Sequence, residues 1–207
     1  MAVITNYATL QTEIANTLSR DDLTAEIPQF IQFAENKLYR TLNLRNEETA
    51  LNVSISSGVA AVPSDFKAIK LAYYDGSPIQ LLQWVPLNEL YRDYPIRSGG
   101  STPSVISREA GNFVFGPVPT EGTLRGVYYA KQDPLRTTDP SWYVTNAPEV
   151  LLYGALLEAA PLIKDDPRIP MWDSFYRNAI DTLKEENENA EVSKSALTIR
   201  ANASNNP

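Results

Sequence analysis

The feature that most constrains this chain lies between residues 147 and 186, where two helical segments with very different faces follow one another. The first, Val150 to Ala160, is apolar at almost every position, so a helix built from it has apolar side chains nearly all round. The second has one charged face and one apolar face, formed by Trp172, Phe175, Tyr176, Ala179 and Leu183. A helix without a polar face is buried in a protein core or in a membrane. We expect the first helix, together with Trp172 and Phe175, to lie in a core.

A membrane is not the expected surrounding of this segment. The apolar run from Val150 to Leu157 ends at Glu158, whereas a helix that spans a bilayer needs about 20 apolar residues. The opening residues, MAVITNYATLQ, lack the basic and apolar regions of a signal peptide. We therefore expect a soluble, cytoplasmic protein with no membrane partner.

Composition removes several classes of function. At 207 residues, 43% of them hydrophobic, the chain is long enough for one large domain or two small lobes with a real core. It has no Cys and no His, which removes thiolate sites, His-based metal sites and Ser-His-Asp triads. Its net charge of -7 argues against a non-specific nucleic-acid binder. We expect no enzymatic activity, no bound metal and no cofactor.

Two amphipathic helices are predicted near the N-terminal end. The first has apolar residues at helical spacing that share one face: Tyr7, Leu10, Ile14 and Leu18. Thr5 or Asn6 can cap it. The second starts near Pro28, because proline suits the first helical turn. Its inner face carries Ile27, Phe30 or Ile31, Ala34, Leu38 and Leu42. Its outer face carries Glu35, Asn36, Lys37 and Arg40.

From Glu47 the apolar period changes to two, which is typical of strands. Strands are predicted over 51–56, 59–62, 69–73, 78–83, 104–108, 112–115 and 123–131, with a short helix from Pro86. Ile69, Leu71 and Tyr73 are expected to share the apolar face of their strand. Asp75 and Gly76 form a strong hairpin signal. Short strands with turn signals at this density indicate an antiparallel sandwich or a small barrel.

These elements predict an α+β fold in which the two ends of the chain meet. A helix as short as 7–18 is marginal alone in water and needs a partner. We expect a four-helix bundle formed by the N- and C-terminal helices, residues 1–46 and 147–192. The β module, residues 47–146, is inserted between them, and residues 193–207 form a flexible C-terminal tail.

Candidate sites are few, and each has two interpretations. Arg97 to Thr102 is Gly-rich but lacks the Lys of a phosphate-binding loop, so a flexible surface loop is favoured. Asp165 and Asp166 could bind a hard cation, or cap the last helix. The tyrosine pairs 73–74 and 128–129 put one ring on each sheet face, for cross-strand packing or as a carbohydrate- or protein-binding platform.

Four segments resemble the head-to-tail adaptor proteins of tailed bacteriophages, such as the podovirus tail accessory factors and gatekeeper-type adaptors. Residues 9–45 resemble their first helical pair, with an apolar-Pro entry at Ile27 to Ile31. The other three similar segments are 60–76, 112–130 and 151–183. Segment 60–76 contains a Pro-x-Asp-Phe motif, Pro63 to Phe66, just before a predicted strand. Their order and spacing make the combined resemblance more specific than any one motif.

The resemblance implies a structural, non-enzymatic protein of the virion, located at the head-tail interface and assembled in the host cytoplasm. Such proteins form a dodecameric ring beneath the portal, which extends the DNA channel used in ejection and docks the tail. The implied partners are the portal ring, the tail nozzle or another tail protein, and neighbouring copies. Genomic DNA would pass through without sequence-specific binding. The acidic run from Glu185 to Glu191 is then either a solvated helix end or a negative wall that repels DNA.

The tail supplies the candidate partner-contact residues Leu197, Ile199 and Arg200. Leu197 and Ile199 alternate, so the segment could add as a strand to an edge on a neighbour or the portal, with Arg200 meeting a carboxylate. Three alternatives stay open for the chain as a whole. They are a neck, head-completion or tail-tube-proximal phage protein, a carbohydrate-binding module, and a hydrolase that uses carboxylates alone.

Overall fold

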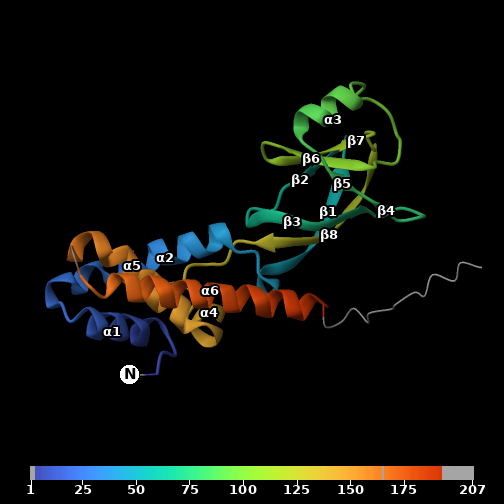
Figure 1. Ribbon diagram of the computed structural model, residues 1–207. Coiled ribbons are helices and arrows are strands. Elements are labelled where there is room, and N and C mark those ends of the chain that lie inside the picture. Colours follow the sequence, from blue (N-terminus) through green and yellow to red (C-terminus); the bar gives the residue numbers. More distant parts are fainter. Residues whose placement is uncertain (1–2, 165, 193–207) are drawn as a thin grey trace, which may run out of the picture. The chain divides into compact units, whose positions relative to one another are not determined.

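Two units make up the chain in the computed structural model, which describes residues 3–164 and 166–192 (Figure 1). The helical unit contains the chain up to Thr41 and again from Pro134 onward, and the strand unit contains Leu42–Asp133. The strand unit is therefore a single continuous insertion between the two halves of the helical unit. Residues 134–146 group with the helices and include the short helix α4, Trp142–Asn146.

The first two helices form where the apolar spacing predicts them. Helix α1, Tyr7–Leu18, is capped by Asn6, whose side chain accepts the Thr9 N–H while the Asn6 N–H donates to the Thr9 hydroxyl. A 3-10 turn, η1, Asp21–Glu26, leads into α2, Ile27–Thr41. The predicted inner faces are confirmed, because Leu10, Ile14 and Leu38 are fully buried.

Helix α5, Pro148–Ile163, is the centre of the helical unit. It contacts α1, α2, α4 and α6, Ile169–Val192. Most of the segment predicted to lie in a core is buried, and Leu156 is 0% exposed; the buried residues are Val150, Leu151, Leu152, Gly154, Ala155, Leu156 and Ala159. A side chain at Gly154 would press on Ala34 of α2 and Tyr176 of α6, so these three helices approach closely there.

The four-helix bundle expected from the sequence is not shown by these contacts. In such a bundle each helix turns one apolar stripe toward a shared core. Helix α5 instead is apolar nearly all round, and within the described residues it contacts α1, α2, α4 and α6.

Arg168 ties the turn between α5 and α6 to the end of α1. Its guanidinium donates to the carbonyl oxygens of Thr17 at 2.7 Å and Leu18 at 3.3 Å, and is held by Asp166 at 2.7 Å. These bonds satisfy carbonyls that the end of α1 leaves free. Asp166 thus pairs with an arginine, and Asp165 lies outside the described residues.

The strand unit contains strands β1 to β8 and one helix. Their bounds are β1 Glu48–Ser56, β2 Val59–Ala61, β3 Phe66–Tyr74, β4 Gln80–Leu81, β5 Gln83–Trp84, α3 Leu87–Asp93, β6 Val105–Glu109, β7 Asn112–Gly116 and β8 Glu121–Ala130. The 3-10 turn η2, Arg45–Glu47, precedes them. The strands pair in the order β4-β3-β8-β1-β2-β7-β6-β5. Six of the seven predicted strands are present within a few residues of their expected bounds, and the one predicted over 78–83 is replaced by the two short strands β4 and β5.

One short segment brings the two ends of this order together. Strands β4 and β5 are separated only by Leu82, whose N–H donates to the Ala72 carbonyl of β3 at 2.9 Å. The next N–H, of Gln83, donates to Ser104 at 2.9 Å, beside β6. Because the backbone changes partner between residues 82 and 83, the sheet is a nearly closed barrel. The β5–β6 pair is parallel, so the expectation of a purely antiparallel module is wrong at this point.

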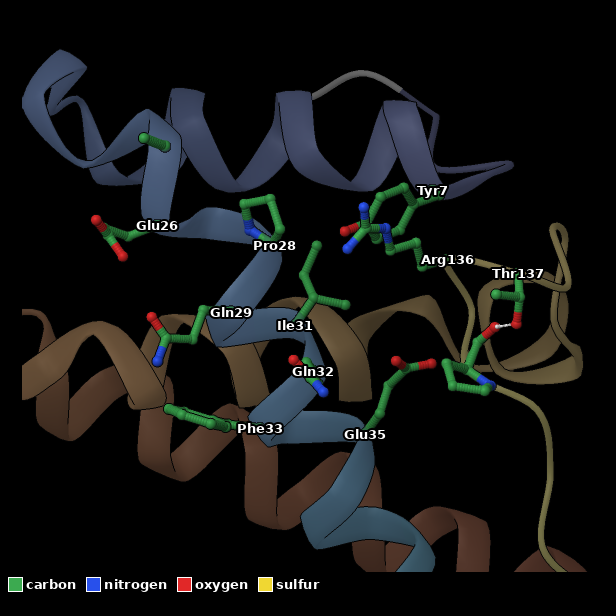
Figure 2. A pocket seen from close by; sticks show the side chains of 12 residues that line it. Tyr7, Glu26, Pro28, Gln29, Ile31, Gln32, Phe33, Glu35, Arg136 and Thr137 are labelled. Carbon is green, nitrogen blue, oxygen red and sulfur yellow. Dashed lines mark hydrogen bonds between the residues drawn. The ribbon is translucent and has the colours of Figure 1, made fainter.

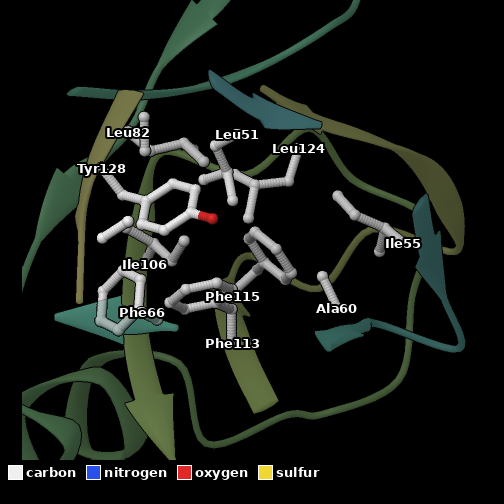
Figure 3. Packing of buried hydrophobic residues seen from close by; sticks show 12 residues of the cluster. Leu51, Ile55, Ala60, Phe66, Leu82, Ile106, Phe113, Phe115, Leu124 and Tyr128 are labelled. Carbon is white, nitrogen blue, oxygen red and sulfur yellow. The ribbon is translucent and has the colours of Figure 1, made fainter. Parts of the chain in front are cut away.

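Aromatic rings fill the inside of the barrel (Figure 3). The ring of Phe66 meets that of Phe113 edge-on at 5.2 Å and stacks on Tyr128 at 5.7 Å. The Tyr128 hydroxyl donates to Asp65 at 3.0 Å, which satisfies the one polar atom that this ring brings into the core. The strand unit thus has an apolar core of its own.

The burial of α5 can be tested with Leu156→Ala. We expect a loss of about 2–5 kcal/mol in the free energy of unfolding, the usual range for truncating a buried Leu. Glu188→Ala, at an exposed position on α6, should cost far less. Chemical denaturation of both variants measures the difference, and the opposite ranking would contradict the burial of α5.

Candidate interaction surfaces

The strand unit carries an apolar patch on β3, on β4 and on the residue before β4, which we call the hairpin face: Leu71, the half-buried Tyr73, Ile79 and Leu81. Leu71, Ile79 and Leu81 are 47%, 60% and 62% exposed. Tyr73 lies directly opposite Leu81, and Leu71 precedes Tyr73 by two residues in β3, which puts these three on one face; Ile79 lies just before β4. Large apolar side chains gathered outside a core mark an interaction surface.

The hairpin face arises from an irregularity in β3. The β3–β8 register shifts between Ile69 and Leu71, which moves Ala72 into the barrel and Leu71 out of it. A side chain at Gly126 of β8 would lie 2.0 Å from the Leu71 carbonyl oxygen, so only glycine allows this approach. The expectation that Leu71 belongs to the buried face is therefore wrong.

The helical unit contains a pocket of about 460 Å³, which we call the Glu35 pocket (Figure 2). Its walls come from α2, from the chain just after Pro134 and from the start of α1, and they include Tyr7, Pro28, Ile31, Glu35 and Arg136. Phe33 also lines it and is 45% exposed. The pocket therefore combines an apolar wall with a few titratable groups.

Glu35 is buried in this pocket at 5% exposure, so its predicted place on the outer face of the helix is wrong. Its Oε1 accepts the Leu135 N–H at 2.9 Å, a partner 100 positions away that the sequence pattern does not reveal. Burial raises the pKa of Glu35, and the Leu135 hydrogen bond opposes that rise. The sequence does contain one signal for the burial of Glu35. Glu35 follows Ile31 by four residues and precedes Leu38 by three, which is the spacing of residues on the inner face of the helix.

No Lys or Arg among the described residues forms an ion pair with Glu35. Arg136 lies within electrostatic reach of Tyr7: burial raises the pKa of Tyr7, the positive charge of Arg136 lowers it, and Glu35 raises it further. Tyr7, Glu35 and Arg136 therefore line the same pocket and influence one another electrostatically. Within the described residues the Glu35 carboxylate accepts a single hydrogen bond and forms no ion pair.

Two other sequence expectations concern α6. Phe175 is 43% exposed and packs its ring at 5.1 Å from Tyr153, so its expected place in the core is wrong. It lies at the edge of the stripe defined by Trp172 and Leu183, both buried. Beyond Leu183, the side chains of Glu185, Glu186 and Glu188 are exposed.

The three predicted partner-contact residues, Leu197, Ile199 and Arg200, lie outside the described residues, so their role stays a prediction. Within residues 3–164 and 166–192, no three His, Cys, Asp or Glu side chains lie close enough together to hold a metal ion. The helices of this part of the chain include none that is both long and apolar enough to cross a membrane.

Comparison with known proteins decides the family. The family model described as SU10 adaptor protein matches residues 5–200, which include both units. The chain belongs to the SU10 adaptor protein family. No curated protein matches it. The family confirms the resemblance to phage head-to-tail adaptors: this adaptor is a structural phage protein of the virion that interacts with other head or tail proteins.

The raised pKa of Glu35 predicts a pH-dependent stability. The Glu35 carboxyl group keeps its proton to a higher pH in the folded protein than in the unfolded chain. The free energy of unfolding therefore falls as the pH rises from about 4.3, the ordinary pKa of a Glu side chain, through the raised pKa of Glu35. Glu35→Gln keeps an oxygen for the Leu135 N–H but cannot ionise. We expect the stability of this variant relative to wild type to increase between about pH 4 and pH 8. Denaturant titrations across this range measure it, with Glu188→Gln as the exposed control; a pH-independent difference for Glu35→Gln contradicts the assignment.

Proposed function

We propose that this adaptor forms a ring beneath the portal of a tailed phage, extends the DNA channel and docks the tail. The observation that carries the proposal is the family match over residues 5–200. Twelve copies are expected, as the resemblance to head-to-tail adaptors implies. The sequence and the two units support it in the following ways.

A closed ring needs two different complementary faces on every subunit, because its contacts are heterologous. The helical unit and the strand unit have separate cores, so each can carry a binding surface without disturbing the other. We assign the portal and the neighbouring copies to the helical unit. We assign the tail nozzle or another tail protein to the strand unit, through the hairpin face.

The charge of the protein fits a channel through which DNA slides. The chain has a net charge of -7, and exposed Glu185, Glu186 and Glu188 follow one another near the end of α6. Acidic residues are unfavourable near a helix C-terminus, and no basic residue lies in the last turn of α6 to offset them. We propose that these carboxylates form a negative wall, which lets the genome pass without sequence-specific binding during ejection.

Residues 193–207 are proposed to form an assembly element. Leu197 and Ile199 supply the alternating apolar side chains of an added strand, and Arg200 supplies a cation for a carboxylate on the partner. A segment that orders only when it binds couples assembly to the presence of the right partner.

Deleting residues 194–207 tests this element. The melting temperature of the free protein should change little, because the deleted residues add almost no apolar surface. Ring formation on purified portal rings, followed by sedimentation and electron microscopy, should be lost or strongly weakened. Normal assembly of the shortened protein, or unfolding of the free subunit, contradicts the role.

The hairpin face is tested with Leu81→Asp. The side chain is 62% exposed, so we expect a normal melting temperature and normal rings on the portal. Binding of the tail protein to these rings should fall, because a carboxylate in an apolar contact is desolvated without a partner. Ile96→Asp is the matched control, since Ile96 is 75% exposed in the same unit but lies outside the hairpin face. Equal docking by both variants removes the hairpin face from the proposal.

A further inference from the structure

The Glu35 pocket has no role in the function described so far, yet it holds an unusual carboxylate. Glu35 is 5% exposed, and its Oε1 accepts the Leu135 N–H at 2.9 Å. The other oxygen, Oε2, accepts no hydrogen bond from the described residues, and no Lys or Arg among them forms an ion pair with it. A buried carboxylate is costly unless it is paired and hydrogen-bonded. The group can therefore still take a positively charged partner.

The cavity in front of this carboxylate has the size of a small-molecule site. Figure 2 shows the Glu35 side chain reaching from α2 toward the segment that carries Arg136 and Thr137, which forms another wall of the pocket. The volume of about 460 Å³ lies in the range of ligand sites, which join an apolar lining to a few polar groups. The cavity and the incompletely paired carboxylate are separate observations, and both indicate a ligand.

The charges around the pocket favour a ligand with a positive group. Two carboxylates line it, that of Glu35 and that of the exposed Glu26, against one guanidinium, that of Arg136. The positive charge of Arg136 acts on Tyr7, whose pKa it lowers, and within the described chain it forms no ion pair with Glu35. An anion in the pocket would meet two like charges, whereas a cation can bind the free oxygen of Glu35.

The apolar part of the lining selects what carries the positive group. Pro28, Ile31 and Phe33 line the pocket, and Phe33 is 45% exposed. A metal ion surrounds itself with oxygen ligands, so this apolar lining does not suit it. An ammonium or guanidinium group at the end of a short aliphatic stem suits both parts of the pocket, because its head pairs with the carboxylate while its methylene groups cover apolar side chains.

We propose that the Glu35 pocket binds a small organic cation, a primary alkylamine or alkylguanidine, the class to which the polyamines belong. The charged head donates to Oε2 of Glu35, and the aliphatic stem packs against Ile31 and Phe33. All the residues that line the pocket belong to the helical unit of one copy, so the site does not depend on the proposed ring. It adds small-molecule binding to the structural role of this adaptor.

Calorimetric titration of the full-length protein with methylammonium, butylammonium and butanoate, at constant ionic strength, tests the class of ligand. Each methylene group buried beside apolar side chains should tighten binding about fourfold, so butylammonium should bind at least about tenfold more tightly than methylammonium. Butanoate, an anion of similar length, should not bind detectably. At about pH 6 the binding of butylammonium should release a proton, because the pKa of Glu35 is raised and the cation binds the ionised carboxylate, whereas an ordinary Glu is already mostly ionised there.

Four variants locate the site. Glu35→Gln should weaken the binding of butylammonium at least about tenfold, because the ion pair is lost. Phe33→Ala should reduce the advantage of butylammonium over methylammonium, and Arg136→Gln should tighten the binding of both, because it removes a like charge. Glu188→Gln, at an exposed carboxylate of α6, is the matched control and should bind as wild type does.

Melting temperatures check that each variant folds. If Glu35→Gln does not fold, Phe33→Ala and Arg136→Gln decide the question, because both change exposed side chains. No measurable binding of butylammonium, equal affinity for butylammonium and methylammonium, tighter binding of butanoate, or unchanged binding by a folded Glu35→Gln overturns the inference.

Discussion

The architecture depends on covering helix α5, which is apolar nearly all round. Its neighbours α1 and α2 come from the N-terminal part of the chain, whereas α4 and α6 flank it in sequence. Burial of α5 therefore requires the two ends of the chain to meet, and whatever lies between α2 and α4 must leave the helical unit and return to it. The strand unit meets that condition as one continuous insertion, Leu42–Asp133, with its own aromatic core.

The strand unit has almost no free sheet edge, because one backbone segment, residues 82–83, bonds to strands at both ends of the sheet. Leu82 bonds to β3 and Gln83 to the chain beside β6, so the two ends of the strand order are joined by a single residue. Edge strands invite uncontrolled pairing, and near-closure limits it. Leu71 and Leu81 remain outside this closed core, so they are free to serve an interface without being required for the barrel.

Much of this fold could be predicted because its signals are local. The spacing of Leu10, Ile14 and Leu18, the cap at Asn6, and the period-two pattern from Glu47 each depend on a few neighbouring residues. The failures depend on distant ones: Glu35 is buried by an N–H 100 positions away, and Leu71 is turned outward by a register shift against β8. Glu35 and Leu71 both belong to the candidate interaction surfaces, and for both the exposure predicted from the sequence differs from the exposure in the fold.

The central claim, that this adaptor forms a ring between the portal and the tail, is tested most directly by cryo-electron microscopy of the phage neck. The account predicts a ring directly beneath the portal into which the helical unit and the strand unit each fit as separate bodies, with the helices toward the portal and the barrel toward the tail. A neck map in which that ring is built from a different fold, with this protein elsewhere in the virion or absent from it, would contradict the account.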